Sequence, residues 1–171
     1  MSPEKLQNIS DENLVNKDHN NTKKGLEKSA VEDFLKWYNT KNNTKLSIIK
    51  VGDRPDIILS NGIGVEVAHI FPNDKCAKVI LTPTQKGASY TNSDFIYEFN
   101  RVITKKCKKI PTYNYDGNIF LLIRVGINFF TQEDFQRIRS KIKIANNCCF
   151  KIYVSFCNMN VNKWCDVIKL R

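Results

Sequence analysis

Two carboxylates near the middle of the chain have the residue type and spacing of a metal-binding pair. Asp56 opens the apolar segment Asp-Ile-Ile-Leu, and Glu66 lies within Ile-Gly-Val-Glu-Val-Ala, with the turn Ser60-Asn61-Gly62 between them. Two strands joined by such a turn can direct both carboxylates toward one point. Carboxylate oxygens suit Mg²⁺ or Mn²⁺, which bind one or two of them together with water and substrate phosphate. An unpartnered charge inside the apolar run around Glu66 would be costly, which favours a specific role over a solvated acid.

The elements around this pair predict an α/β domain. The predicted strands are apolar runs at 45–51, 56–59, 63–70, 118–125, 150–156 and 166–170. The predicted helices, from periodicity and capping residues, are about 26–39, 92–110 and 131–144. Two prolines favour a loop at 72–91, in which a short strand at 78–81 stays open. The order helix, three strands, helix, strand, helix, strand predicts a mixed sheet with helices packed on it.

The composition indicates a single globular domain preceded by a polar arm. The chain has 171 residues, of which 42% are hydrophobic and 26% charged. Residues 1–22 are rich in Asn, Asp, Ser and Lys without apolar periodicity, which predicts a disordered or loosely attached arm before a domain at 23–171. No apolar stretch approaches the roughly 18 residues of a membrane span, and no secretory signal opens the chain. We therefore expect no membrane partner and a cytoplasmic protein, or a nuclear one in a host with a nucleus.

The net charge of +10 comes entirely from residues 101–171, which carry fourteen Lys and Arg against four acids. Such an asymmetry favours a polyanionic partner, because neutralising phosphates releases counterions. The alternative is a generic solubilising surface. Several of the basic residues share one predicted helix, which favours nucleic acid. The predicted nucleic-acid contacts are Arg101, Lys105, Lys108 and Lys109.

The six cysteines show no CxxC spacing, which argues against a zinc cluster. In a reducing compartment, free cysteines pack as small hydrophobic residues. We therefore expect them to be reduced and mostly buried.

Pro55-Asp56, with Glu66-Val67-Ala68 following, resembles the motif of the PD-(D/E)xK nuclease superfamily. The similarity covers roughly residues 23–124, over which the predicted order of elements matches the helix, three strands, helix and strand of that family. The resemblance implies a restriction-endonuclease-like αβββαβ core and Mg²⁺- or Mn²⁺-dependent hydrolysis of phosphodiester bonds. It also implies that Asp56, Glu66 and the Val67 carbonyl hold the metal.

The motif's lysine is absent from its usual position, two residues after the glutamate, where this chain has Ala68. His69 cannot replace it, because alternation points His69 to the opposite face of the strand. Some branches of the family take the lysine from the following helix. Lys106 falls within the apolar arc of that helix, four residues beyond Val102, whereas Lys105 lies toward its edge. Lys106 is therefore the predicted catalytic lysine, with Lys105 as the reserve and a lysine that snorkels out at the helix end as the alternative.

Glu27 falls on the apolar face of the first predicted helix, four residues before Val31 and seven before Phe34. Many branches of the family place a glutamate on this helix near the metal, so the resemblance implies a supporting catalytic role for Glu27. An ordinary first-turn glutamate, favoured by the helix dipole, is the alternative.

These expectations combine into a metal-dependent endonuclease, with DNA preferred over RNA as the substrate. Two alternatives stay open: a nuclease fold without activity that binds nucleic acid or protein, and an RNA-cleaving relative. Ala68 keeps the first alternative open. Many nucleases of this family act as dimers, so a homodimer is compatible with the resemblance, although no apolar stripe identifies an interface.

Overall fold

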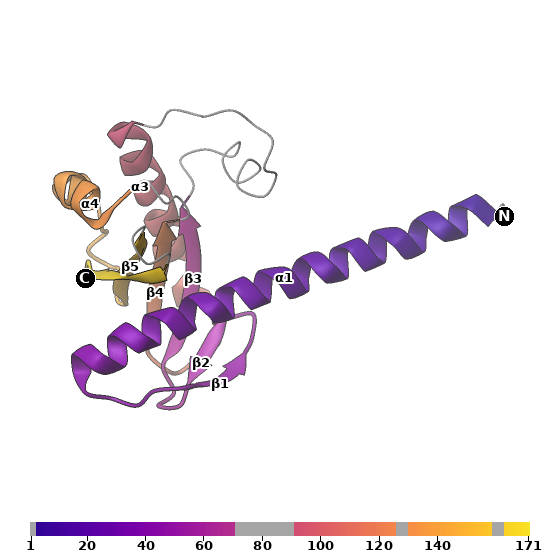
Figure 1. The fold of residues 1–171 in the computed structure, drawn as a ribbon, viewed down its shortest axis with the longest axis horizontal. Coiled ribbons are helices and arrows are strands. Elements are labelled where there is room, and N and C mark those ends of the chain that lie inside the picture. Colours follow the sequence, from indigo (N-terminus) through magenta and orange to yellow (C-terminus); the bar gives the residue numbers. More distant parts are fainter. Residues whose placement is uncertain (1–2, 71–90, 126–129, 159–162) are drawn as a thin grey trace.

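A computed structural model of the chain describes residues 3–70, 91–125, 130–158 and 163–171. These residues form a six-stranded mixed sheet flanked by three helices, which confirms the predicted α/β class (Figure 1). The helices are α1 (Pro3–Asn42), α3 (Asn92–Lys109) and α4 (Gln132–Ile138). The strands are β1 (Ile48–Val51), β2 (Ile57–Leu59), β3 (Gly64–Ile70), β4 (Ile119–Val125), β5 (Lys151–Asn158) and β6 (Lys163–Lys169).

The strands lie in the sheet in their order along the chain, β1 to β6. β1, β2 and β3 pair antiparallel, β3, β4 and β5 pair parallel, and β6 returns antiparallel to β5. Parallel neighbours need a crossover connection. α3 lies in the connection from β3 to β4, and α4 in the connection from β4 to β5. This order brings β3, which carries Glu66, into the interior of the sheet.

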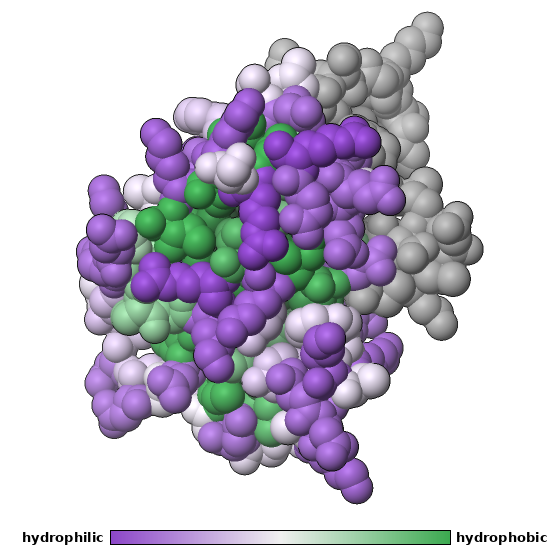
Figure 2. Space-filling view, turned by 90° about the vertical axis from the view of Figure 1, so that its left-hand side faces the viewer, coloured by the Kyte–Doolittle hydropathy of each residue, from purple (hydrophilic) through white to green (hydrophobic). Residues whose placement is uncertain are grey.

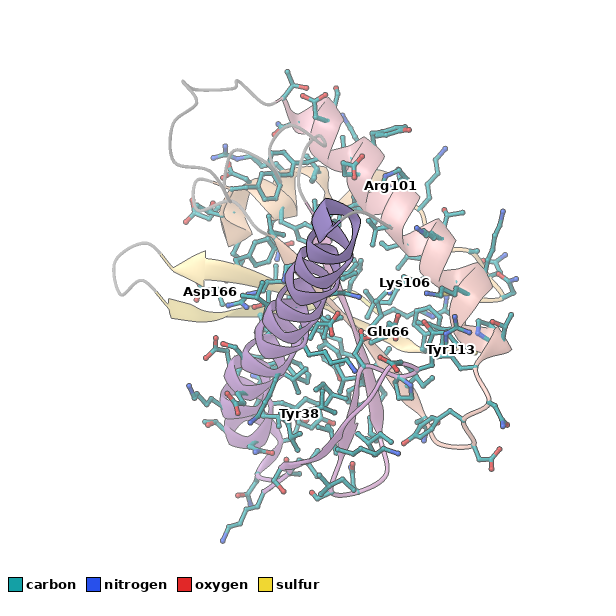
Figure 3. The ribbon with its side chains drawn as sticks, turned by 90° about the vertical axis from the view of Figure 1, so that its right-hand side faces the viewer. Tyr38, Glu66, Arg101, Lys106, Tyr113 and Asp166 are labelled. Atoms are coloured by element: carbon teal, nitrogen blue, oxygen red, sulfur yellow. A yellow bond between two sulfur atoms is a disulfide. The ribbon has the colours of Figure 1, made fainter. Side chains whose placement is uncertain are left out.

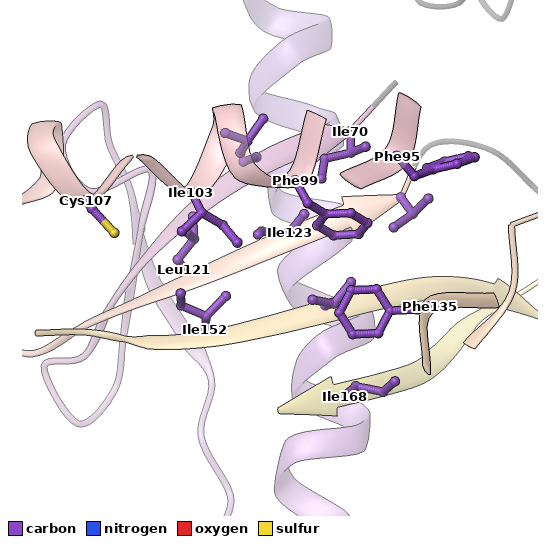
Figure 4. Close-up of a cluster of buried hydrophobic side chains, with 14 of the residues drawn as sticks. Ile70, Phe95, Phe99, Ile103, Cys107, Leu121, Ile123, Phe135, Ile152 and Ile168 are labelled. Carbon is purple, nitrogen blue, oxygen red and sulfur yellow. The ribbon is translucent and has the colours of Figure 1, made fainter. Parts of the chain in front are cut away.

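The two faces of the sheet bury separate hydrophobic clusters. Val65 and Val67 of β3 pack with Val31 and Phe34 of α1. On the other face, α3 and α4 cover a cluster that includes Ile70, Phe99, Ile103 and Phe135 (Figure 4). Since side chains alternate along a strand, Glu66 lies on the face that α3 covers. A lysine on the inner side of α3 is therefore within reach of Glu66. A residue of α1 that faces Val67 lies on the other side of the sheet.

Outside the core, polar side chains dominate. On the face shown in Figure 2, hydrophilic side chains surround smaller areas of hydrophobic ones. In the part of the chain that the structure describes, no helix is long and apolar enough to cross a membrane.

The first helix begins earlier than the sequence predicts. α1 starts at Pro3 rather than near residue 26, and its N-terminal part projects away from the sheet (Figure 1). Residues 3–22 are thus helical and not a coil, because a helix can extend beyond its packed part once that part has nucleated it. That this segment is a loosely attached arm stays a prediction.

The helix after β4 is shorter than predicted. α4 ends at Ile138 and passes into a 3₁₀ turn, Arg139–Lys141, instead of continuing to about residue 144. The backbone N–H of Lys143 donates to the side-chain oxygen of Asn100 at 2.7 Å. This contact with α3 takes an amide that a longer helix would have bonded internally, so tertiary structure ends the helix.

Other boundaries agree within one to three residues. Thr91, rather than Asn92 or Ser93 as the sequence predicts, caps α3 and forms a capping box with Asp94. Thr131 caps α4 as predicted, with Asp134 completing the box. The predicted loop at 72–91 falls outside the described residues except for Thr91, and so does the strand considered at 78–81.

One expectation about the cysteines is wrong. Cys107 of α3 and Cys148, before β5, form a disulfide, with their Cα atoms 5.3 Å apart. Both are buried, and they meet because α3 packs on the same hydrophobic cluster that the entry to β5 joins. Cys149 is a free, exposed cysteine.

Candidate functional site

Asp56 and Glu66 come together where β2 separates from β3. The pairing of these strands covers Ile57 with Val65 and Ile58 with Gly64, and Asp56 lies just before it. The Val67 backbone N–H donates to Asp56 Oδ2 at 2.8 Å. Asp56 therefore occupies the edge of β3 beyond the last β2 pair. Asp56 is 7% exposed and Glu66 is 2% exposed, so both carboxylates are almost removed from solvent.

Two donors, one near the C-terminal end of α3 and one shortly after that helix, meet on one oxygen of Glu66 (Figure 3). Lys106 Nζ donates to Glu66 Oε1, and the Tyr113 hydroxyl donates to the same atom at 2.6 Å. The second oxygen, Oε2, is buried and has no hydrogen-bond partner among the described residues. A buried carboxylate oxygen left in this state is costly unless a cation or another donor binds it.

The surroundings of Asp56 disfavour its ionised form. Burial, and then the nearby carboxylates of Glu66 and, less strongly, Glu27, raise its pKa from an ordinary value near 3.8 to about 7. The hydrogen bond from Val67 and the charge of Lys106 act in the opposite direction. Asp56 and Glu66 share a single lysine, Lys106, so ionisation of both carboxylates leaves an excess of negative charge that a divalent cation would neutralise.

Glu27 lies in the buried part of α1, 5% exposed, where the helical spacing placed it. Its carboxylate forms an ion pair with Lys23 at 3.4 Å. Because Glu27 contributes to the pKa of Asp56, α1 brings a third carboxylate toward the pair.

Lys106 is the lysine that the structure places in the site, and Lys105 is exposed. Lys106 holds Glu66 because α3 turns its apolar arc, which includes Val102, onto the sheet face that carries Glu66. The snorkelling alternative does not describe this lysine, whose side chain is 16% exposed and paired with a buried acid.

Tyr113 is the site residue that sequence reasoning missed. It follows the 3₁₀ turn Ile110–Thr112, which redirects the chain after α3. Burial, and then the hydrogen bond and charge of Glu66, raise the pKa of its hydroxyl above the ordinary range. Tyr113 therefore keeps its proton at neutral pH and donates it in the hydrogen bond to Glu66 Oε1. No periodicity marks this position, and only the turn created at Pro111 gives it its direction.

The four predicted nucleic-acid contacts share α3, but they differ in their surroundings. Lys105, Lys108 and Lys109 are exposed. Arg101 donates to both carboxylate oxygens of Glu98, with the shortest contact at 2.7 Å. Glu98 is itself buried, and the sequence analysis did not single it out.

His69 shares none of these contacts with Glu66. Burial, and then the positive charges of Arg124 and Lys23, lower its pKa to about 4, so the imidazole is neutral at pH 7. Its neighbour Lys23 is on α1, which agrees with the prediction that His69 faces away from Glu66.

The donor set fits a magnesium ion that keeps part of its water shell. Among residues 3–70, 91–125, 130–158 and 163–171, no three His, Cys, Asp or Glu side chains are grouped to hold a metal. Mg²⁺ needs fewer, since one or two carboxylates with water and phosphate suffice. Asp56 and Glu66 supply two carboxylates, and Glu66 Oε2 is the oxygen without a partner.

Comparisons of the chain with protein-family models, with curated proteins and with solved structures find no match. The assignment of a function therefore rests on the geometry of the site and on the motif.

Proposed function

We propose that the protein is a metal-dependent nuclease that hydrolyses DNA phosphodiester bonds on a restriction-endonuclease-like core. The single observation that carries the proposal is the contact between Lys106 and Glu66. The motif lacks its lysine on β3, where Ala68 stands, and the lysine on α3 reaches the glutamate of the motif instead. A lysine in this place can act on a substrate that is bound at the motif, which an exposed lysine at a helix end cannot do.

The residues of the chain divide the work between holding and acting. Asp56, Glu66 and the Val67 carbonyl would hold the ion, with Glu66 Oε2 as the oxygen that is ready for it. Tyr113 would fix the Glu66 carboxylate by its hydrogen bond to Oε1 at 2.6 Å. Mg²⁺ bound there would supply a Lewis acid that activates water and polarises the phosphodiester.

Lys106 would act on the substrate itself. Its ammonium neutralises Glu66 while the site is empty, which limits the cost of burying that carboxylate. Once the charge of Glu66 is balanced in another way, the ammonium can turn to a phosphate oxygen and stabilise the charge that develops in the transition state. Glu27 would orient water beside Asp56, because its carboxylate raises the pKa of Asp56 from α1.

Plasmid cleavage tests this proposal. We expect the protein to nick supercoiled plasmid in Mg²⁺ or Mn²⁺, to be silent in chelator, and to lose activity in Asp56→Ala and Glu66→Gln. Lys36→Ala serves as a control, because that side chain is 79% exposed and bonds only within α1 at Asp33. Unimpaired cleavage by Glu66→Gln would exclude this site, and DNA binding without cleavage in any metal would favour an inactive binding module.

A further inference from the structure

The outer side of α3 carries a groove that the candidate site does not use. Its volume is about 540 Å³. It is lined by Tyr97, Asn100, Arg101, Thr104, Lys105 and Lys108. All six residues come from α3, and hydrogen bonds with Lys141 and Lys143 hold the side chain of Asn100. None of the six is acidic.

Tyr97 is a large residue held largely in solvent, at 66% exposed. Phe95 and Phe99, on the inner side of α3, are at most 3% exposed, so the helix does not need Tyr97 for its packing. An aromatic ring held in solvent on a rigid helix offers a flat surface on which a planar group can stack.

The cations beside this ring define the charge of its ligand. Lys105 and Lys108 line the groove and are exposed. Arg101 also lines it, but two of its nitrogens are bound to Glu98, which fixes the guanidinium on the helix surface. The ligand that fits an aromatic surface with two lysines and an oriented arginine is an anion that carries flat rings.

The groove lies on the side of α3 that faces away from the candidate site. Lys106 is nine residues from Tyr97, and at about 100° per residue the two side chains point to opposite sides of the helix. At about 1.5 Å per residue, Tyr97 and Lys108 are roughly 16 Å apart along the axis. That distance is about five nucleotides of a stacked strand at roughly 3.4 Å each. The groove is therefore long enough for a short strand segment outside the candidate site.

We propose that this groove binds a single-stranded segment of DNA, with a base stacked on Tyr97 and phosphates at Lys105 and Lys108. Lysines alone would fit duplex and single strands alike. Tyr97 makes the difference, because both faces of a base inside a duplex are already covered by its neighbours. The proposal rests on the proposed function for the identity of the ligand, and it adds a contact for unpaired DNA on the side of α3 that faces away from the candidate site.

Fluorescence anisotropy in chelator tests binding without cleavage. The probes are a labelled thymidine oligonucleotide, its hybrid with a complementary strand, and the same sequence as RNA. We expect Tyr97→Ala to lose about fivefold or more in affinity for the single strand, and Tyr97→Trp to retain it. Both variants should bind the duplex as the unmodified protein does. Lys36→Ala, on the surface of α1, is the matched control for Lys108→Ala, which should weaken binding to both forms in a salt-dependent way.

The outcomes separate this proposal from the nuclease proposal. Unchanged single-strand affinity in Tyr97→Ala, or equal losses for single strand and duplex, would overturn the stacking role even if the protein cleaves DNA. A selective loss would support the groove even if no metal restores cleavage. Tighter binding of the RNA probe by a Tyr97-dependent contact would overturn DNA as the ligand. Circular dichroism serves to check that the variants fold. We expect them to fold because Tyr97 is exposed.

Discussion

Replacing Asp56 by Asn should stabilise the folded protein at pH 8 while it removes activity. The Asp56 carboxylate is 7% exposed and its pKa is raised to about 7, mainly by burial and by Glu66. The unfolded chain has no such burial, so the folded state carries the cost of an ionised carboxylate at high pH. An asparagine has no charge to bury, and its side-chain oxygen can still accept the Val67 N–H.

The sign and size of the effect follow from proton linkage. Between about pH 4 and pH 7 the folded protein keeps a proton on Asp56 that the unfolded chain has lost, so the free energy of unfolding falls as the pH rises. The rise in pKa from 3.8 to about 7 corresponds to at most about 4 kcal/mol above pH 7. Loss of the attraction to Lys106 reduces the gain, and we expect about 1 to 3 kcal/mol.

Thermal and urea unfolding of the metal-free protein at a series of pH values provide the assay. Asp56→Asn should be the more stable protein at pH 8, by roughly 2 to 10 °C in melting temperature, and the difference should vanish near pH 4. Asp53→Asn is the control, because that carboxylate is 83% exposed and should show no such dependence. A variant that is equally or less stable than the unmodified protein at pH 8 would refute the reasoning.

Three further predictions concern the elements around the pair. Lys106→Met should abolish plasmid cleavage, whereas Lys105→Met should keep most of it, because only Lys106 reaches a buried carboxylate; equal losses in both would contradict the assignment. Tyr113→Phe should fold normally and lose about 10- to 100-fold in metal affinity, measured by calorimetry, since it removes one of the two donors that orient a ligand. Replacing Cys107 and Cys148 together by Ser should lower the free energy of unfolding by about 4 kcal/mol, because the disulfide closes a loop of 41 residues; an unchanged urea midpoint would refute it.

The part of the site that could be predicted from sequence is the part that periodicity controls. Alternation placed Glu66 on one face of β3, and helical spacing placed Lys106 and Glu27 on the buried sides of their helices. The two repeat lengths of strand and helix gave these positions, and the resemblance to the PD-(D/E)xK superfamily indicated which helices to consider. In the structure Glu66 and Glu27 are buried, and Lys106 forms an ion pair with the buried Glu66.

The rest depends on contacts between residues far apart in the chain. Tyr113 reaches Glu66 across 47 positions, after a turn whose direction no local pattern specifies. The disulfide joins residues 41 positions apart, and Asn100 ends α4 from another helix. Such contacts are set by packing, so neither residue type nor spacing could have revealed them. The start of α1 is a different case. A helix can extend through residues 3–22 without the apolar periodicity that predicts its start near residue 26.

The central claim is that Asp56 and Glu66 bind one divalent cation, and a crystal structure with Mn²⁺ tests it most directly. The account predicts one anomalous peak within about 2.0 to 2.3 Å of a carboxylate oxygen of each residue, with Glu66 Oε2 as one of the two. Tyr113 should remain on Oε1. No peak between the two carboxylates at saturating Mn²⁺, with Glu66 Oε2 still without a partner, would contradict the account.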